Sequence, residues 1–504
     1  MKSRKLILVT AMTLFTALAI PVRLAAQEQN QQERAKPHRY TFVEVVTLGG
    51  PNFSSNFTGA PNTLLNNRGT LAGGADTIET DPFCLNNPDC FVMHAFRWRD
   101  GVVTDLGTLP GGANSQAFWV NGRGLIAGMS QNGVIDPLLG IQALKAVVWD
   151  DGDIVNLGTL EGGYESLAQS INDRGQVTGI ALNTVPDPFA CCAFFPNTQN
   201  RAFLWKDGEM QDLGTLGGPD AQGKFINDRG QIAGISYVSF EPTSSGEPQI
   251  DPFLWEDGVM MDLGSLGGTF GEPEGLNNRG QVVGDMNLAG DVTGHPFLWQ
   301  RGSLLDLGTL GGTFGLARAV NDSGEIVGSA TNQNDQAMLA FVWQKGVMTD
   351  LGTLKGYDCS IGQNINSRGQ IVGASFSCAG GAFNATLWDN GSVIDLNSFV
   401  PPTANLHLIG DDIYINDRGE IAGTGALPNG DIRAFVLIPC EGKHADDEGC
   451  RDEGESIVAE TQRTSGPITR SADATQGRLK PETLAVLRTQ LARRYRGFAA
   501  WPKE

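Results

Sequence analysis

Apolar residues along most of the chain fall in short runs that end at polar, glycine-containing turns. Within one stretch of the chain, four such runs cover residues 252–255, 259–263, 274–276 and 281–284. Phe253 and Trp255 lie on one face of the first run, and Leu254 lies on the other. Strands that are buried on both faces lose the alternation of polar and apolar positions. The pattern therefore predicts four short strands that pack against a neighbour on each side.

The polar segments between these runs carry turn signals. Glu256-Asp257-Gly258 separates the first two strands, and Asp-Gly between apolar runs is a strong hairpin signal. Asn277-Asn278-Arg279-Gly280 separates the last two strands, where Asn accepts N–H groups of its own turn and Gly tolerates positive φ. We interpret this Asn motif as turn chemistry rather than as a binding site.

The same pattern recurs along the chain. The Asn motif and a following glycine occupy Asn66–Gly73, Asn121–Gly128, Asn172–Gly179, Asn227–Gly234, Asn277–Gly284, Asn321–Gly328, Asn366–Gly373 and Asn416–Gly423. A tryptophan strand lies between copies, and the shortest spacing is 44 residues from Trp255 to Trp299 and from Trp299 to Trp343. A period of this length indicates a repeat architecture. Four-stranded repeats with two buried faces predict an all-β fold, an eight-bladed β-propeller of antiparallel blades, with a parallel solenoid as the alternative.

The two ends of the repeat region complement each other. Residues 44–50 match residues 262–268, which form a second strand and its glycine-rich loop, but no first strand precedes them. The missing first strand appears at residues 433–437, where no second strand follows. We expect 433–437 to pair antiparallel with 41–47, so that the N- and C-terminal strands close the ring.

His94-Ala95-Phe96 heads one tryptophan strand, and variants of this triplet start at Arg201, His295 and Arg433. Together with the Leu-Gly-Thr-Leu-Gly-Gly element, these repeats resemble the bacterial extracellular repeat family named for its His-Ala-Phe (HAF) motif. The resemblance spans roughly residues 40–440 and implies a secreted, repeat-built bacterial protein. The family has no well-established activity, so the resemblance implies no catalytic residue.

Long insertions occur in only one of the four connections of the repeat, at residues 74–93, 129–144, 180–200 and 235–250. In a meander, this connection and the glycine-rich loop lie at the same end of the strands. Long variable connections on a rigid scaffold commonly carry binding sites. We therefore expect the functional face to be the one that carries these insertions.

One polar position repeats within a strand. It holds a carboxylate at Glu44, Asp105, Asp212, Asp262, Asp306, Asp350 and Asp395, and an amide at Asn156. A functional interpretation is an acidic ring that attracts cations. The structural interpretation is a side-chain oxygen that accepts backbone N–H groups of the following loop, and Asn156 favours it because an amide keeps the acceptor without the charge.

Eight cysteines form an even set, which suits disulfides in an exported protein. We expect Cys84 to bond Cys90, Cys359 to bond Cys378, and Cys440 to bond Cys450, and we leave the pairing of Cys191 and Cys192 open. Zinc is the alternative, but no C-x₂-C pair occurs. We therefore expect no metal site and no cofactor.

The ends of the chain predict its location and its domains. Basic residues, an apolar run from Leu6 to Val22 and Ala25-Ala26 are typical of a signal peptide over 1–26. We expect linkers at 27–39 and 441–475, the propeller at 40–440, and an amphipathic helix or tail at 476–504 with Leu484, Leu487 and Leu491 on one face. The destination is extracellular, with the periplasm or the cell surface as alternatives.

Charge and motifs limit the function. The net charge of −20 argues against nucleic acid as a partner, because a polyanion would be repelled. No membrane span is expected after signal cleavage, and no catalytic residue stands out, because hydrolase and metalloprotease motifs do not occur. We expect a monomeric, non-enzymatic binding or scaffold protein for a glycan or protein ligand. The alternative is a secreted hydrolase or lyase that acts on an extracellular polymer, marked by non-repeated charged residues at the channel mouth.

Overall fold

The structure, a computed structural model, describes residues 39–54, 63–81, 90–137, 140, 142–187, 189, 198–244, 246–381, 383–440 and 450. Contacts divide the chain into Met1–Arg39 and Tyr40–Glu504, and apart from Arg39 everything described belongs to the second part. The described residues form strands and two short 3-10 helices, η1 (Gln333–Asp335) and η2 (Leu396–Phe399). The prediction of an all-β fold is confirmed. The expected signal peptide, the two linkers and the C-terminal helix lie outside the described residues, apart from Arg39 and Cys450.

Antiparallel pairing arranges the strands in groups of four, which we call modules and number in chain order. Module 1 consists of β2 (Gly49–Ser54), β3 (Leu71–Thr80), β4 (Phe91–Arg99) and β5 (Val102–Gly107), and module 2 consists of β6 (Ser115–Val120), β7 (Ile126–Ile135), β8 (Gln142–Asp150) and β9 (Asp153–Asn156). Module 3 consists of β10 (Ser166–Ile171), β11 (Val177–Pro186), β12 (Thr198–Lys206) and β13 (Glu209–Asp212), and module 4 consists of β14 (Ala221–Ile226), β15 (Ile232–Pro242), β16 (Pro248–Glu256) and β17 (Val259–Asp262).

Module 5 consists of β18 (Gly267–Leu276), β19 (Val282–Leu288), β20 (Gly294–Gln300) and β21 (Ser303–Asp306), and module 6 consists of β22 (Gly311–Val320), β23 (Ile326–Asn332), β24 (Met338–Gln344) and β25 (Val347–Asp350). Module 7 consists of β26 (Cys359–Ile365), β27 (Ile371–Phe376), β28 (Asn384–Asp389) and β29 (Ser392–Asp395), and module 8 consists of β30 (His407–Ile415), β31 (Ile421–Ala426) and β32 (Ile432–Pro439) with β1 (Tyr40–Val45). Single parallel bridges from Ile250 to Phe270 and from Gly294 to Phe314 join modules 4, 5 and 6.

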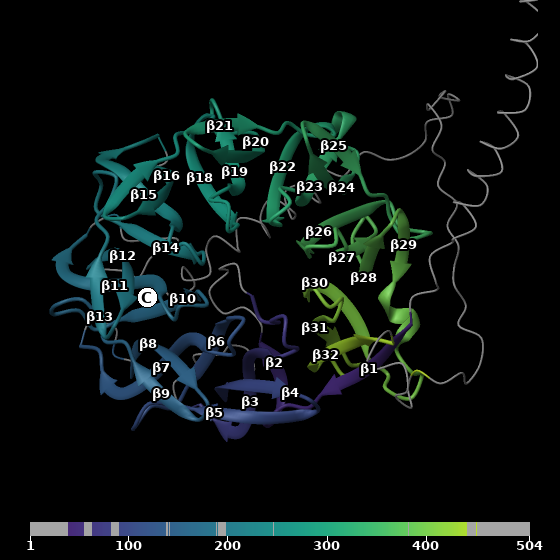
Figure 1. The fold of residues 1–504 in the computed structure, drawn as a ribbon, viewed down its shortest axis with the longest axis horizontal. Helices are drawn as coiled ribbons and strands as arrows, with labels where there is room; N and C mark the ends of the chain where they lie inside the picture. Colours follow the sequence, from purple (N-terminus) through teal and green to yellow (C-terminus); the bar gives the residue numbers. More distant parts are fainter. Residues whose placement is uncertain are drawn as a thin grey trace, which may run out of the picture. The chain divides into compact units, whose positions relative to one another are not determined.

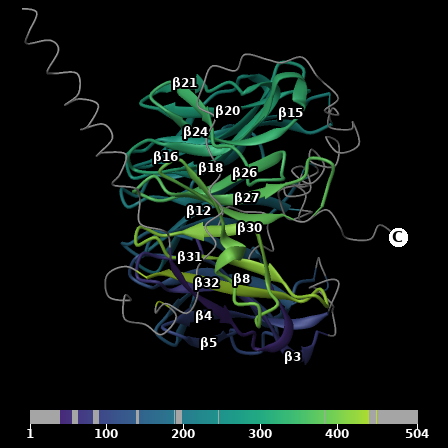
Figure 2. The same ribbon diagram turned by 90° about the vertical axis from the view of Figure 1, so that its right-hand side faces the viewer.

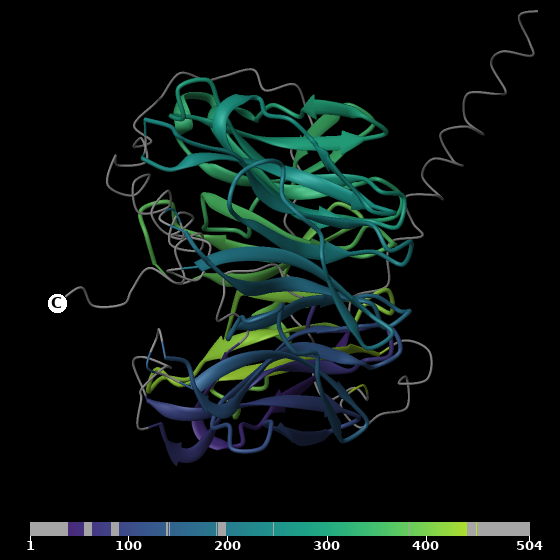
Figure 3. The ribbon, with the colours of Figure 1, turned by 90° about the vertical axis from the view of Figure 1, so that its left-hand side faces the viewer.

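Each module places its first strand toward the middle of the view and its fourth strand at the rim, as β10 and β13 show in Figure 1. We call these the inner and outer strands. Figure 2 shows β30, β31 and β32 beside β26 and β27, and Figure 3 shows the blue and teal strands of the earlier modules from the opposite side. Apolar side chains fill the space between neighbours: Leu204 of module 3 packs in one cluster with Phe253 and Trp255 of module 4. Both faces of the modules are therefore buried, as the sequence pattern predicted.

The structure corrects where a module begins. The sequence pattern placed the tryptophan strand first and the glycine-rich loop inside a repeat. In the structure, the tryptophan strand is third, and the glycine-rich loop joins one module to the next, as Leu263–Gly268 does between β17 and β18. The insertions accordingly lie within modules, between second and third strands.

The predicted pairing of the chain ends is confirmed. β1 pairs antiparallel with β32, with Glu44 opposite Phe435 and Phe42 opposite Leu437. Phe435 and Leu437 are fully buried and belong to the same cluster as Tyr40. The N-terminal strand is therefore the outer strand of module 8.

The Asn turns of neighbouring modules are hydrogen-bonded to one another. The Oδ1 atom of Asn172 accepts the N–H groups of Arg174 and Gln176 at 3.0 Å, which confirms the turn chemistry. Its Nδ2 atom donates to the backbone oxygen of Asn227 at 3.0 Å. Each Asn turn makes the equivalent bond, of 2.8–3.1 Å, to the next turn along the chain, and Asn416 makes it to Asn66. The turns follow in the order Asn66, Asn121, Asn172, Asn227, Asn277, Asn321, Asn366 and Asn416. Sequence analysis identified the turn but missed the bond between modules.

A second set of contacts, which we call clasps, joins modules near the start of each inner strand. In each clasp, a side chain of the next module accepts a backbone N–H from the region of the third strand. The donors and acceptors are Met93 and Asn114, Leu144 and Glu165, Asn200 and Asp220, Met338 and Cys359, and Ile432 and Asn52. The two parallel bridges occupy the same place between modules 4, 5 and 6. His407 Nε2 lies 3.0 Å from the oxygen of Phe383 between modules 7 and 8. The clasp from Ile432 to Asn52 joins module 8 to module 1.

A β-bulge in the inner strand explains the second glycine of the Asn motif. In module 3 the register shifts between Ala168 and Ser170, so Gln169 is extra. A Cβ on Gly179, which pairs with Ala168, would lie 1.9 Å from the oxygen of Leu167. Glycine is therefore required opposite the bulge.

Candidate functional site

The hairpins between second and third strands are long in modules 1 to 4. In β11, pairing with β12 is interrupted after Leu182 and resumes at Pro186, so three residues leave the ladder. Three residues also leave the ladder after Asp76 and after Gln131, and four leave it after Tyr237. The corresponding second strands of modules 5 to 8 end earlier, at Leu288, Asn332, Phe376 and Ala426. In the residues that the structure describes, the predicted insertions are thus mainly extended strands rather than loops.

The glycine-rich connections lie at the same end of the modules as these hairpins. A Cβ on Gly163, in the connection that precedes β10, would lie 1.9 Å from the oxygen of Leu182. The backbone of the connection therefore approaches closely the point where the hairpin leaves its ladder. We call this end, formed by the four long hairpins and the glycine-rich connections, the insertion face.

The insertion face carries an exposed apolar side chain in the interrupted stretch of each of the four hairpins. The exposed fractions of Ile78, Val134, Val185 and Phe240 are 76%, 52%, 48% and 55%. Glu79 and Glu241 stand beside two of them and are also exposed. Isolated exposed apolar residues are ordinary, but one in the interrupted stretch of each of four consecutive hairpins forms a repeated surface. This surface can contact an apolar partner, and its carboxylates favour a basic rim on that partner.

Three clasps under these hairpins contain paired polar groups. Asp81, Asp136 and Asp187 follow β3, β7 and β11, and they meet Asn114, Glu165 and Asp220 of the next module. All six residues are buried. Burial raises the pKa of Glu165 to about 8, and the carboxyl group of Asp136 adds to the rise while the N–H of Leu144 and the charge of Lys145 oppose it. Burial and the carboxyl group of Asp187 also raise the pKa of Asp220.

Sequence analysis missed these clasps, although a signal was present. Asp81, Asp136 and Asp187 are each followed by proline, at the same point of three insertions. An Asp-Pro step that recurs at one place of a repeat indicates a fixed structural role for the carboxyl group. Its partner in the next repeat was not apparent because Asn114, Glu165 and Asp220 differ in type.

A second polar group lies on the inner strands of modules 4, 5 and 6. Lys224 and Glu272 form an ion pair, and Arg318 Nη1 lies 2.9 Å from Glu274 Oε2. Lys224, Glu274 and Arg318 are the extra residues of their β-bulges. Burial lowers the pKa of Lys224 to about 8, against the raising effect of Glu274 and Asp285. We call these five residues, four on inner strands and Asp285 on the adjoining β19, the inner-strand cluster.

Among the strands that the structure describes, the inner-strand cluster is not repeated, and it is enclosed. The side chains of its two ion pairs are at most 13% exposed. Each pair joins neighbouring modules, from β14 to β18 and from β18 to β22. Buried ion pairs of this kind fix one arrangement of their strands, because separating either partner leaves an uncompensated charge.

The expected acidic ring lies on the outer strands. Oδ1 atoms of Asp105, Asp212, Asp262, Asp306, Asp350 and Asp395 accept a backbone N–H two residues later at 2.7–2.9 Å, as Asn156 also does. This contact confirms the structural interpretation. Glu44 lies in β1, opposite Phe435. The attraction of cations by this ring stays a prediction.

Three residues of the His-Ala-Phe position pair with this ring. His94 Nδ1 and His295 Nδ1 lie 2.9 Å from oxygens of Asp105 and Asp306, and Arg201 Nε lies 3.0 Å from Asp212. Burial lowers the pKa of His94, but the hydrogen bond and charge of Asp105 raise it more, so it lies above its ordinary value. The first residue of the motif therefore binds the outer strand.

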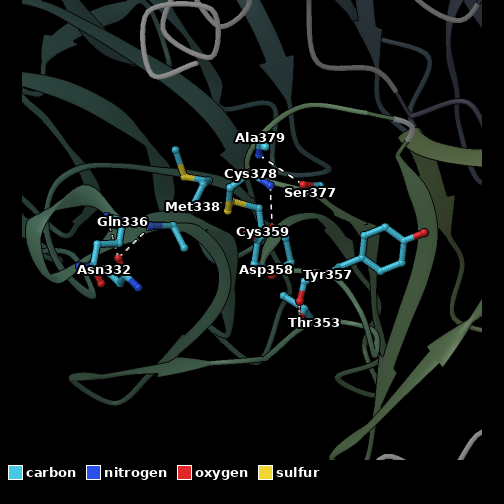
Figure 4. Close-up of a disulfide and its surroundings, with 12 residues drawn as sticks. Asn332, Gln336, Met338, Thr353, Tyr357, Asp358, Cys359, Ser377, Cys378 and Ala379 are labelled. Carbon is cyan, nitrogen blue, oxygen red and sulfur yellow. Dashed lines mark hydrogen bonds between the residues drawn. A yellow bond between two sulfur atoms is a disulfide. The ribbon is translucent and has the colours of Figure 1, made fainter. Parts of the chain in front are cut away.

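Two expected disulfides are present. Cys359 bonds Cys378, and Cys440 bonds Cys450. Figure 4 shows the first bond with Asp358 beside it, and the N–H of Cys378 donates to Asp358 at 2.7 Å. Cys90 is also disulfide-bonded. Its expected partner Cys84, as well as Cys191 and Cys192, lie outside the described residues.

Asp358, Cys359 and Cys378 gather closely enough to hold a metal ion. Both sulfur atoms of this group are engaged in the disulfide, so they are not available as thiolate ligands. Within the described ranges, no helix has the length and apolar character needed to cross a membrane.

Comparisons with known proteins find distant structural similarity only. No family model and no curated protein matches the chain. The β-propeller domain of the Trilobed protease from Pyrococcus furiosus aligns with 67% of this chain and 95% of its own at 10% identity and a TM-score of 0.38. An acylaminoacyl peptidase from Pyrococcus horikoshii aligns with 75% of this chain and 58% of its own at 10% identity and a TM-score of 0.39. Similarity at this level carries no information about the activity of this chain.

Proposed function

We propose that this chain is a secreted, monomeric, non-enzymatic binding protein. It is built as a closed eight-bladed propeller, and its insertion face binds a protein partner. Two observations support closure. The bonds between Asn turns return from Asn416 to Asn66, and the clasp of Ile432 with Asn52 joins the last module to the first. The pairing of β1 with β32 completes the outer strand of module 8.

The observation that carries the binding role is the row of exposed apolar residues near the tips of four consecutive hairpins. Ile78, Val134, Val185 and Phe240 would otherwise expose apolar surface with no compensating contact. Apolar contacts with an acidic rim favour a protein partner with a basic rim over a neutral glycan.

The alternative, a hydrolase or lyase, would be favoured by non-repeated charged groups that a substrate can reach. The inner-strand cluster supplies such groups, but Lys224 and Glu272 are paired and enclosed. This burial supports a structural role between modules. Secretion is supported by the disulfides Cys359–Cys378 and Cys440–Cys450, which are typical of oxidising compartments.

The test uses the full chain on an array of purified extracellular proteins and glycans. The tip variant combines Ile78→Ser, Val134→Ser, Val185→Ser and Phe240→Ser. The matched control combines Val102→Ser, Val259→Ser and Val347→Ser, which remove valines of 62–64% exposure at the first position of three outer strands. We expect the chain to bind a protein on the array. The tip variant should weaken this binding about tenfold or more, and the control should leave it unchanged. Binding that both variants retain equally, or chemical turnover of an arrayed polymer, would contradict the proposal.

A further inference from the structure

The polar pairs under the long hairpins are built to one plan. Asp81, Asp136 and Asp187 occupy the same place after the second strand of modules 1 to 3. Their partners Asn114, Glu165 and Asp220 occupy the same place before the inner strand of the next module. Each partner also accepts the N–H of the clasp, at 2.8, 2.6 and 2.7 Å. The three clasps therefore differ only in the chemistry of the second contact.

The clasp with asparagine shows what this second contact requires. Asn114 accepts the N–H of Met93 through Oδ1, and its Nδ2 donates to Asp81 Oδ2 at 3.1 Å. The group that faces the first aspartate is thus a hydrogen-bond donor.

In the other two clasps, a carboxyl oxygen takes the place of that donor. Glu165 uses Oε2 and Asp220 uses Oδ1 for the clasp N–H. Their other oxygens, Glu165 Oε1 and Asp220 Oδ2, are buried and accept no hydrogen bond. The same holds for Asp187 Oδ2. A carboxyl oxygen can donate in this position only if it carries a proton.

We infer that Asp136–Glu165 and Asp187–Asp220 each share one proton, and that its loss to solvent releases the hairpins of modules 2 and 3 from their neighbours. This regulation rests on the proposed function, because these hairpins carry Val134 and Val185. The released state presents the insertion face without a fixed arrangement, so binding weakens as the pH rises. The hairpin of module 1 does not respond, because Asn114 holds Asp81 without a titrating proton.

Other charged groups near the pairs set how readily the proton is lost. Lys145 faces Glu165 and Asp136, and its charge favours the ionised form. Around Asp187 and Asp220 lie Tyr237, Glu247 and the amide of Asn200. Arg201 donates to the oxygen of Pro219 but pairs with Asp212.

The direction of the pH effect follows from the raised pKa of the buried carboxyl groups. A carboxyl whose pKa is about 8 in the folded protein and near 4.5 when released stabilises the clasp fully below pH 4.5. This stabilisation is lost as the pH rises toward 8, and no further change follows above it.

The experiment measures hydrogen exchange of the hairpins in the full chain between pH 5 and 9, corrected for intrinsic exchange rates, with no ligand present. We expect opening of 126–135 and 177–186 to increase at least about tenfold by pH 8, while 71–80 does not change. The variants Glu165→Gln and Asp220→Asn copy Asn114 and should abolish the increase. The reverse change, Asn114→Asp, should give 71–80 the same response.

The inference fails if 71–80 opens with pH as the other hairpins do, or if Asn114→Asp adds no response. The second variant keeps the test decisive should Glu165→Gln not fold. Because exchange is read without ligand, a failure here is distinct from a failure of the proposed binding role. A partner identified on the array should then dissociate from the wild-type chain as the pH rises to 8, but not from the Glu165→Gln/Asp220→Asn chain.

Discussion

At the scale of single residues, one side chain performs two tasks in each Asn turn. Asn227 accepts the N–H groups of Arg229 and Gln231 through Oδ1 and donates through Nδ2 to the oxygen of Asn277. The first task shapes the turn, and the second joins two modules. Aspartate would keep the acceptor and lose the donor, which also bonds Gln231 Oε1 of the same turn at 2.8 Å.

We therefore expect Asn227→Asp to lower the free energy of unfolding by about 1–3 kcal/mol, because the buried oxygens of Asn277 and Gln231 lose their shared donor. Asn227→Ala should cost more, since it also removes the turn acceptor. Urea denaturation followed by tryptophan fluorescence measures both. Asn429→Asp is the matched control, because Asn429 lies in an exposed turn and its side chain bonds Asp431 of the same turn through both Oδ1 and Nδ2. A loss of similar size in the control would mean that the bond between modules adds nothing.

The inner-strand cluster makes a second residue-scale prediction. Lys224→Met leaves Glu272 as an unpaired buried charge and should destabilise the chain by about 3–5 kcal/mol. Adding Glu272→Leu should recover most of this loss, because the pair is then replaced by apolar contacts. Denaturation of the single and double variants tests the cycle. If the double variant is as unstable as Lys224→Met, the pair does more than neutralise charge between β14 and β18.

At the scale of elements, the long hairpins join a rigid base to a variable tip. Ile235, Tyr237 and Ile250 lie in the buried part of hairpin β15–β16 and form one cluster with Phe189 and Phe270. Beyond Pro242, the turn is closed by a bond from the N–H of Thr243 to the oxygen of Glu247. The base therefore belongs to the core, and only the tip is free to vary.

Deleting residues 244–246 should consequently change the thermal midpoint by only a few degrees, because loop closure depends weakly on length. Deleting 235–250 should prevent folding, because it removes three buried side chains and the second half of β15. Circular dichroism melts distinguish the two. Equal tolerance of both deletions would show that the hairpin is a dispensable loop along its whole length.

Sequence reasoning predicted the strands and the hairpins because these depend on neighbouring residues. The turns at Asp257-Gly258 and at Asn277–Gly280 are determined by their own residues. It could not set where a module begins, since a repeat reads the same from any starting point. It also could not find the clasps, because Glu165 and Asp136 meet only when two modules are packed together.

At the scale of the whole molecule, the ends of the chain meet in one module. β32 pairs with β31 on one side and with β1 on the other. It also supplies Ile432, whose N–H donates to Asn52 of module 1 at 2.9 Å. Loss of this strand therefore removes two strand pairings and the clasp between the last and first modules.

A chain that stops after Asp431 should be far less stable than one that stops after Pro439, although they differ by eight residues. Phe435, Val436 and Leu437 are almost completely buried, and burying such side chains stabilises by about 1.5–3 kcal/mol each. Their loss approaches the whole stability of an ordinary domain, about 5–15 kcal/mol. Both truncated chains lack the Cys440–Cys450 disulfide and everything after it, so neither feature contributes to the difference.

Thermal melts of the two truncated chains decide whether the ring is closed. Closure predicts a cooperative transition for the chain ending at Pro439 and a large drop in its midpoint for the chain ending at Asp431. Open edges on β1 and β31 should also make the shorter chain aggregate, because unpaired strand edges recruit other strands. Adding a peptide of residues 432–439 should restore part of the lost stability, since it can pair with both edges. Equal midpoints without the peptide would mean that the modules hold together as an open array, in which β32 is only a terminal strand.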